Sequence, residues 1–282
     1  MNQEQNKTMH QFDIKKILED KSPKLTKFIP GFLIRYLKKI AHEEEVNDII
    51  SNYGHLRGFD FSEAMLKLFN VTITVEGEEN LPEKGKYIFV SNHPLGGFDG
   101  HFIMYIIGKK YGHYKFLVND ILMNLKNMSD VFIPVNKHGK QGLELAKQID
   151  KAYESDSQML TFPAGLVSRK IKGSIMDLKW QKNFVVKSKQ HQRDVIPIHI
   201  TGGCSEFFYK LGAIRKKLGI KANIEMLYLI DETFMHKDKT FVVKFGKPIP
   251  WQTFDSSKRP LDWAFWVKQQ LYKMVGLTNI KF

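Results

Sequence analysis

The feature that most constrains the fold is an alternation of short apolar runs with helix-patterned stretches, which begins at Val71 and continues to the C-terminus. The apolar runs predict strands near residues 71–76, 87–91, 115–118, 131–135, 158–162, 195–200 and 240–246. The stretches between them predict helices near residues 99–111, 120–127, 140–154, 177–191, 205–217, 223–234 and 262–275. Apolar strands that alternate with helices build a mostly parallel sheet with helices on its faces. The sequence therefore predicts an α/β fold with a mostly parallel central sheet flanked by helices.

The first 70 residues have a different pattern, which is that of amphipathic helices. After Pro30, large apolar residues recur at helical spacing and basic residues lie beside them. The apolar positions are Phe32, Leu33, Tyr36, Leu37 and Ile40, and the basic positions are Arg35, Lys38 and Lys39. A helix over residues 25–41 could lie in a membrane interface or could pack on the rest of the protein. We therefore divide the chain into an N-terminal helical region, 1–70, which could associate with a membrane, and an α/β domain, 71–282.

The composition limits the partners and the compartment. Forty-three Lys and Arg against 30 Asp and Glu give a net charge of +13, which attracts an anionic membrane surface or a nucleic acid. No zinc-ligand cluster, phosphate loop or aromatic-basic RNA motif accompanies the charge, so we expect no nucleic-acid partner. The single cysteine, Cys204, fits a reducing compartment. The polar N-terminus and the lack of an apolar run of ~20 residues predict a protein that does not cross a membrane.

One glycine-rich turn places a histidine and a carboxylate between a predicted strand and a predicted helix. It runs Ser-Asn-His-Pro-Leu-Gly-Gly-Phe-Asp-Gly over residues 91–100. Imidazole titrates near neutral pH, so His93 could take a proton from a hydroxyl group while Asp99 fixes its tautomer. Gly96 and Gly97 would let the chain fold back and bring the two side chains together. The alternative is that Asp99 caps the following helix, because Asp is favoured at helix N-termini.

Two other predicted strands carry polar side chains. The strand over 131–135 leads to Lys137, which could bind a phosphate or carboxylate or could be a solvated lysine at a strand end. The strand over 195–200 contains His199 between apolar neighbours. That setting favours a hydrogen-bonded core histidine, or a histidine that contacts site residues without touching substrate, over a catalytic histidine.

The segment over residues 160–170 ends a strand sharply and then presents donors. It runs Leu-Thr-Phe-Pro-Ala-Gly-Leu-Val-Ser-Arg-Lys, so that Ser168, Arg169 and Lys170 follow a proline and a glycine. The planar guanidinium of Arg169 can bind two oxygens of an anion at once, which makes it the better anion ligand of the three.

In their order along the chain, these four segments (91–100, 131–137, 160–170 and 195–200) resemble the motifs of the glycerolipid acyltransferase superfamily. That superfamily transfers acyl chains to lysophosphatidic acid and related lipids. The turn with Asn92, His93 and Asp99 resembles the catalytic motif of that family. The family usually has a strand that ends in an acceptor-binding arginine, and residues 132–137 resemble it. Residues 162–165 resemble the Phe-Pro-Glu-Gly motif of the family, and residues 195–198 resemble its final Val-Pro-Val/Ile strand. The resemblance covers residues 70–250, and the order of four motifs is more specific than any one of them.

The sequence departs from the family pattern in three places. Five residues, where the family usually has four, lie between His93 and Asp99; Ala164 replaces the glutamate of the third motif; and Lys137 replaces the arginine. The motifs are more similar to a bacterial branch often labelled hemolysin-like, some members of which O-acylate N-acylated ornithine or glycine lipids. The three departures leave the expected acyl-transfer reaction unchanged. They affect which acyl acceptor we expect.

The resemblance implies an O-acyltransferase that moves a fatty acyl group from an acyl thioester to the hydroxyl group of a lysolipid, with His93 as general base and Asp99 as its partner. The residues that it implies for substrate binding are Asn92, Gly96, Gly97, Lys137, Phe162, Pro163, Gly165, Ser168 and Arg169. No metal and no bound cofactor is implied. The donor would be a thioester of acyl carrier protein or of coenzyme A (acyl-ACP or acyl-CoA). The acceptor would be an N-acyl amino-acid lipid of lyso-ornithine or lyso-glycine type, or lysophosphatidic acid.

The same resemblance, together with the basic charge, predicts a peripheral protein on the cytoplasmic side of the inner (cell) membrane, in contact with its anionic surface. The alternative is a membrane-active, hemolysin-like protein without catalytic activity, which only the label of the branch suggests.

Overall fold

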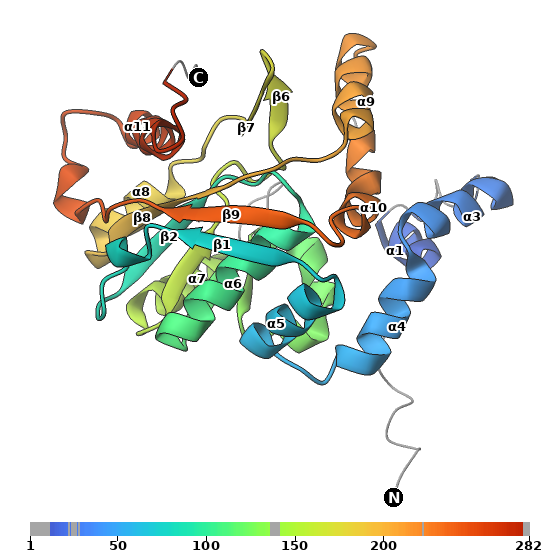
Figure 1. The fold of residues 1–282 in the computed structure, drawn as a ribbon, viewed down its shortest axis with the longest axis horizontal. Coiled ribbons are helices and arrows are strands. Elements are labelled where there is room, and N and C mark those ends of the chain that lie inside the picture. Colours follow the sequence, from blue (N-terminus) through green and yellow to red (C-terminus); the bar gives the residue numbers. More distant parts are fainter. Residues whose placement is uncertain are drawn as a thin grey trace, which may run out of the picture. The chain divides into compact units, whose positions relative to one another are not determined.

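A computed structural model of the chain describes residues 12–21, 23, 27, 29–135, 142–221 and 223–278. Its main feature is a seven-stranded sheet with the strand order β1-β9-β8-β2-β5-β3-β4 (Figure 1). The strands are β1 (Thr72–Glu76), β2 (Tyr87–Ser91), β3 (Tyr114–Asn119), β4 (Phe132–Val135), β5 (Gln158–Thr161), β8 (Asp194–Ile200) and β9 (Thr240–Phe245). All neighbours are parallel except β8 and β9, which are antiparallel. The prediction of an α/β fold with a mostly parallel sheet is confirmed.

Helices cover both faces of this sheet. On one face, alternate residues of β2, Ile88 and Val90, join one apolar cluster with α7 (Leu143–Glu154), α8 (Asn183–His191) and α11 (Pro260–Lys273). On the other face, Phe89 contacts Tyr111 of α6 (Gly97–Tyr111), which packs against α5 (Gly58–Leu68). Every residue of β2 is buried, as expected of a parallel strand with helices on both sides.

The chain forms two compact units, one of residues 57–203 and 238–282 and the other of residues 1–56 and 204–237. The first unit contains the sheet. The second contains helices that are far apart in sequence: α1 (Ile14–Lys21), α3 (Gly31–Ile40), α4 (Glu43–Tyr53), α9 (Glu206–Lys217), η4 (Ile224–Tyr228) and α10 (Leu229–Phe234). These limits differ from the boundary near residue 70 that the sequence suggested, because α5 groups with the sheet. A functional division at that boundary stays a prediction.

Three segments differ from the secondary structure that we predicted. Residues 120–127 contain two short 3₁₀ helices, η2 (Asp120–Asn124) and η3 (Lys126–Met128), in place of an α-helix. Helix α8 begins only at Asn183, later than the predicted start near residue 177, and residues 169–176 form an unpredicted hairpin of β6 (Arg169–Ile171) and β7 (Ser174–Met176). Its turn residues, Lys172 and Gly173, both have positive φ, 49° and 85°. Two-residue hairpin turns favour that backbone, because its twist matches the twist of the strands.

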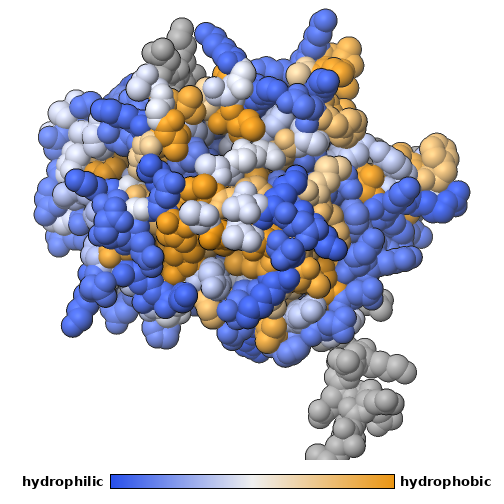
Figure 2. Space-filling view, viewed as in Figure 1, coloured by the Kyte–Doolittle hydropathy of each residue, from blue (hydrophilic) through white to orange (hydrophobic). Residues whose placement is uncertain are grey.

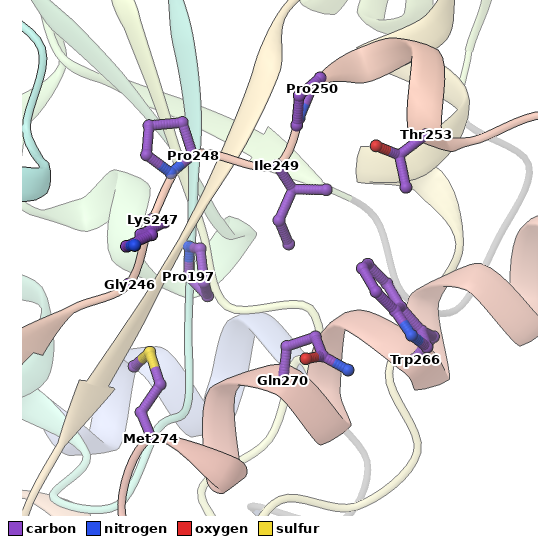
Figure 3. Close-up of a pocket in the computed structure, with 10 residues that line it drawn as sticks. All are labelled: Pro197, Gly246, Lys247, Pro248, Ile249, Pro250, Thr253, Trp266, Gln270 and Met274. Atoms are coloured by element: carbon purple, nitrogen blue, oxygen red, sulfur yellow. The ribbon is translucent and has the colours of Figure 1, made fainter.

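A pocket of about 340 Å³ lies between the segment that follows β9 and helix α11 (Figure 3). Its lining is Pro197, Gly246, Lys247, Pro248, Ile249, Pro250, Thr253, Trp266, Gln270 and Met274. A Cβ atom on Gly246 would lie 2.7 Å from Cγ of Pro197, so the close approach of this rigid ring in β8 favours glycine there. None of the described residues that we predicted for the site lines this pocket.

No helix in the described ranges of the chain has both the length and the apolar character needed to span a bilayer.

Candidate active site

The predicted site residues gather where three neighbouring strands end. His93 follows β2, Phe162 follows β5, and β8 ends at Ile200 on the other side of β2. All three strands are parallel, so their carboxyl ends meet at one edge of the sheet, which is where open α/β sheets bind ligands.

The central interaction is a hydrogen bond of 2.7 Å between Nδ1 of His93 and Oδ2 of Asp99. The same Oδ2 accepts hydrogen bonds from the backbone N–H groups of Leu95 (2.9 Å) and Gly96 (3.0 Å) at the start of α6. Asp99 therefore both caps the helix and contacts the ring of His93, and a catalytic role for the pair stays a prediction. Gly96 has a φ of 83°, a left-handed backbone that glycine adopts without strain.

The ring of His93 is held from a second side by Phe162. The two rings are stacked, with centroids 4.1 Å apart and planes 12° apart. The Asp99 side chain is fully buried, whereas that of His93 is 18% exposed. An ionised Asp99 accepts the Nδ1 hydrogen, which makes Nε2 the unprotonated ring nitrogen. The arrangement can take up a proton at Nε2 from a group that approaches from solvent.

A second buried carboxylate, Asp177, supports the histidine from its backbone side. Its Oδ1 accepts hydrogen bonds from the backbone N–H of His93 (3.1 Å) and from the hydroxyl of Ser168 (2.5 Å). Its Oδ2 accepts from the indole N–H of Trp180 (2.7 Å). In addition, the backbone N–H of Ser168 donates to the carbonyl oxygen of His93 (2.7 Å). Asp177 thus fixes the backbone of the His93 turn to the segment that precedes β6.

Helix α11 completes this network. The buried ammonium of Lys268 donates to the carbonyl oxygens of Asp177 (2.7 Å) and Leu178 (3.0 Å), and the backbone N–H of Asp177 donates to the hydroxyl oxygen of Tyr272 (2.7 Å). Burial raises the pKa of Asp177, and hydrogen bonds from Ser168 and Trp180 oppose that shift. Burial likewise lowers the pKa of Lys268.

The sequence does not predict Asp177 or Lys268 as residues of the site. Asp177 stood within a stretch predicted as helical, and its partners lie up to 95 positions away along the chain. The Lys-Gly turn of the β6–β7 hairpin was the available signal, since it would have shown that residues 169–176 are extended and return toward the turn.

Two of the predicted substrate-binding side chains are engaged within the protein. Asn92 is buried and forms a pair of hydrogen bonds with the end of β8, donating to the carbonyl oxygen of Ile200 (2.9 Å) and accepting from its N–H (2.7 Å). Ser168 is fully buried and donates to Asp177. Both therefore support the framework of the site, and substrate contact by either stays a prediction.

The third motif forms the turn that leads from β5 to β6. The N–H of Gly165 donates to the carbonyl oxygen of Phe162 (2.9 Å), and Pro163 is buried. Arg169 follows Ser168 directly, and its guanidinium donates to the carbonyl oxygens of Val167 (2.7 Å) and Ser168 (3.4 Å). The structure therefore places Arg169 on the segment bonded to the His93 turn.

The remaining predicted residues have varied positions. Gly97 is exposed at the first position of α6. Lys137 lies outside the residues that the structure describes. His199 is buried, as expected of a core histidine, and its ring meets the edge of Tyr272 at 5.8 Å. Its Nδ1 has no hydrogen-bond partner among the described residues, so the expected hydrogen bond is not found there. Within the same residues, no three His, Cys, Asp or Glu side chains gather as metal ligands.

Comparisons with known proteins show the family of the chain. A family model described as acyltransferase matches residues 16–274. The chain is 51% identical over 263 residues to a protein of Bacteroides thetaiotaomicron named lyso-glycine lipid O-acyltransferase, with 93% of this chain and 97% of the relative covered. It is 49% identical to a protein of the same name from Phocaeicola vulgatus, with 93% of this chain and 94% of that relative covered.

Among solved structures, the chain is similar to the 1-acyl-sn-glycerophosphate (LPA) acyltransferase PlsC from Thermotoga maritima. The two are 14% identical, with a TM-score of 0.49 and coverage of 93% of this chain and 88% of the other.

The chain therefore belongs to the acyltransferase family. It is an O-acyltransferase, which confirms the resemblance to the glycerolipid acyltransferases and sets aside the alternative of a membrane-active protein without catalytic activity.

Proposed function

We propose that this enzyme transfers a fatty acyl group from an acyl thioester to the hydroxyl group of a lyso-glycine lipid. The observation that supports the chemistry is the 2.7 Å contact between His93 Nδ1 and the buried carboxylate of Asp99, with the imidazole partly exposed. The acceptor follows from the names of two relatives at about 50% identity along nearly the whole chain.

The proposed reaction is a direct transfer in which His93 acts as general base and then as general acid. Nε2 takes the proton of the acceptor hydroxyl as its oxygen attacks the thioester carbonyl. The tetrahedral intermediate then collapses, the C–S bond breaks, and the thiolate receives the proton from the imidazolium. Asp99 stabilises the imidazolium and keeps Nε2 as the reactive nitrogen. No acyl-enzyme is formed.

The acceptor carries a carboxylate if its glycine nitrogen is acylated, and Arg169 is the proposed ligand for that anion. Its planar guanidinium can bind two carboxylate oxygens, and its segment is hydrogen-bonded to the His93 turn through Ser168. Lys137 is a second proposed ligand, on the basis of sequence alone.

The donor is proposed to be an acyl carrier protein, with coenzyme A thioesters as the alternative. The net charge of +13 supports an acidic protein partner, because opposite charges speed association. The enzyme is further proposed to act as a peripheral protein at the cytoplasmic face of the inner membrane. The exposed Phe32 and Tyr36 of α3, beside basic residues, support contact with anionic lipid.

The test is a product assay with the purified full chain. Labelled acyl carrier protein thioester and labelled coenzyme A thioester are each incubated with lyso-glycine lipid, lyso-ornithine lipid and lysophosphatidic acid. We expect an ester product with lyso-glycine lipid at the highest kcat/KM and with the carrier-protein donor. Acylation of lysophosphatidic acid alone would overturn the proposed acceptor, and faster reaction with coenzyme A would overturn the proposed donor.

A further inference from the structure

Helix α9 and the residue that follows it carry an apolar stripe that is largely exposed. Phe207, Leu211, Ile214 and Leu218 recur at spacings of four, three and four residues, which align them along one side of a helix. Phe207 is 51% exposed, Ile214 is 56% exposed and Leu218 is 68% exposed. Figure 2 shows hydrophobic surface over α9 next to hydrophilic surface. Three large apolar side chains exposed along one helix mark a contact surface.

A different face of α9 holds the helix in place. Phe208 and Gly212 are buried, and Arg215 pairs with the fully buried Glu225 of η4 at 2.8 Å. The side chain of Ser205 caps the helix N-terminus by accepting from the N–H of Phe208 (3.1 Å). These contacts hold α9 through side chains other than Ile214 and Leu218.

Tyr228 joins this stripe to α3. Its ring meets that of Phe207 edge-on, with centroids 4.9 Å apart, and that of Tyr36 at 6.5 Å. The hydroxyl groups of Tyr36 and Tyr228 are 2.6 Å apart. On α3, Phe32 is 67% exposed and Tyr36 is 45% exposed. The exposed apolar side chains of the two helices thus belong to one surface, which we call the α3–α9 face.

The charge around this face is mainly positive. Residues 206–221 contain five basic side chains and one acidic side chain, and α3 contains three basic ones and no acidic one. Lys210 and Lys217 are exposed and lie along the edge of the stripe, one turn from Phe207 and Ile214. Apolar and aromatic residues bordered by lysines match the acyl–headgroup boundary of an anionic bilayer. A second protein copy would bring the same positive charge and be repelled.

We propose that the α3–α9 face is a docking surface for an anionic lipid bilayer and that the stripe of α9 inserts into it beside α3. This inference extends the membrane association proposed above from the N-terminal helix to residues 206–221, which lie in the middle of the chain. Residues 204–237, which interrupt the α/β unit in sequence, then serve to bind the bilayer.

The test is co-sedimentation of the full chain with vesicles of phosphatidylglycerol and phosphatidylcholine, and with vesicles of phosphatidylcholine alone. The double variant Ile214→Asn, Leu218→Asn changes two exposed side chains of the stripe. We expect the wild type to bind the anionic vesicles, and the double variant to bind them at least about tenfold more weakly, because two apolar groups no longer leave water. The matched control is Leu143→Asn on α7, which is 71% exposed and lies in the other unit, and we expect it to bind as the wild type does.

Three results would overturn the inference. The first is equal binding by the double variant and the wild type. The second is an equal loss with Leu143→Asn. The third is a wild-type dimer in solution that the double variant converts to a monomer without a change in vesicle binding, which would assign the face to a second copy. If the wild type does not bind anionic vesicles at all, the proposed membrane association fails as well. We expect the double variant to keep wild-type activity on an acceptor that is dispersed in detergent. That measurement separates the inference and the proposed membrane association from the acyl-transfer chemistry.

Discussion

The backbone N–H of His93 donates a 3.1 Å hydrogen bond to Oδ1 of Asp177, a residue 84 positions later in the chain. The side chain of His93 is oriented by Asp99, which lies in the same turn, whereas its backbone is fixed by a carboxylate from another segment. Two buried carboxylates thus position His93: Asp99 contacts its ring, and Asp177 accepts from its main-chain N–H. The geometry of the proposed base therefore depends on the packing of β6, β7 and α11 as well as on the turn itself.

Replacement of Asp177 by Asn should lower kcat while leaving KM for both substrates nearly unchanged. An amide has one acceptor oxygen, so it cannot satisfy the N–H of His93 and the indole N–H of Trp180 at once. We expect a loss of about 10- to 100-fold in kcat from a small displacement of the base. Steady-state kinetics check this, with the exposed Asp156→Asn as control. Unchanged kcat in a folded variant would contradict a positioning role.

Replacement of His93 by Ala should remove general-base catalysis. We expect kcat to fall by about 10²- to 10⁴-fold while the fold stays intact, because Asp99 keeps its hydrogen bonds from the N–H groups of Leu95 and Gly96. The rate of ester formation and a thermal melt provide the measurements. The exposed His113→Ala serves as the matched control. Wild-type turnover by the His93 variant would assign the proton transfer to another group.

Replacement of Asp99 by Asn should affect the rate more than acceptor binding. The amide can present its NH₂ group to Nδ1 of His93, which favours the wrong tautomer and leaves Nε2 protonated. We expect a loss of about 10³- to 10⁴-fold in kcat with little change in the KM of the acceptor. The variant also alters the cap of α6, so circular dichroism should accompany the kinetics. A rise in KM with kcat unchanged would make Asp99 a binding residue.

Replacement of Arg169 by Ala should weaken binding of the acceptor and leave binding of the acyl donor unchanged. Loss of a guanidinium–carboxylate contact should raise the KM of the acceptor by about tenfold, and that of the acyl donor should stay the same. Initial rates at varied acceptor concentration measure this. The adjacent, exposed Lys170→Ala is the matched control for charge. An unchanged KM would remove Arg169 from the site.

The stability of the α/β unit should depend on pH through His199. Burial, and then the charge of Lys244, lowers the pKa of His199 from 6.5 to about 4. Between these values the unfolded chain binds a proton that the folded chain does not bind. The free energy of unfolding therefore rises with pH across this window, and this stability is lost as the pH falls. Its contribution is at most about 3 kcal/mol.

Urea unfolding over that pH window tests this dependence. His199→Gln removes the titrating group, so we expect a shallower increase of the unfolding free energy with pH than in the wild type. The exposed His113→Gln should retain the wild-type slope. Equal slopes for His199→Gln and the wild type would show that His199 titrates normally in the folded state.

The sequence by itself determined the local features of this protein. All seven strands of the sheet lie in segments that the sequence predicted as strands. The central strands β2 and β8 are apolar runs because both of their faces are buried, whereas the edge strand β1 alternates exposed and half-buried residues. The His93–Asp99 pair also follows from sequence, since both residues belong to one turn and their contact needs only a glycine backbone and a helix start. Short-range geometry of this kind is encoded by neighbouring residues.

Only the tertiary structure decided which distant segments meet. Asp177 reaches His93 because the β6–β7 hairpin brings residue 177 back beside Ser168, and α11 packs behind it. Asn92, predicted to bind substrate, instead ties the end of β2 to the end of β8. Likewise, Tyr228 joins α3 to α9 across most of the chain. Such contacts depend on how strands and helices pack in three dimensions, and local sequence patterns do not specify which distant residues meet.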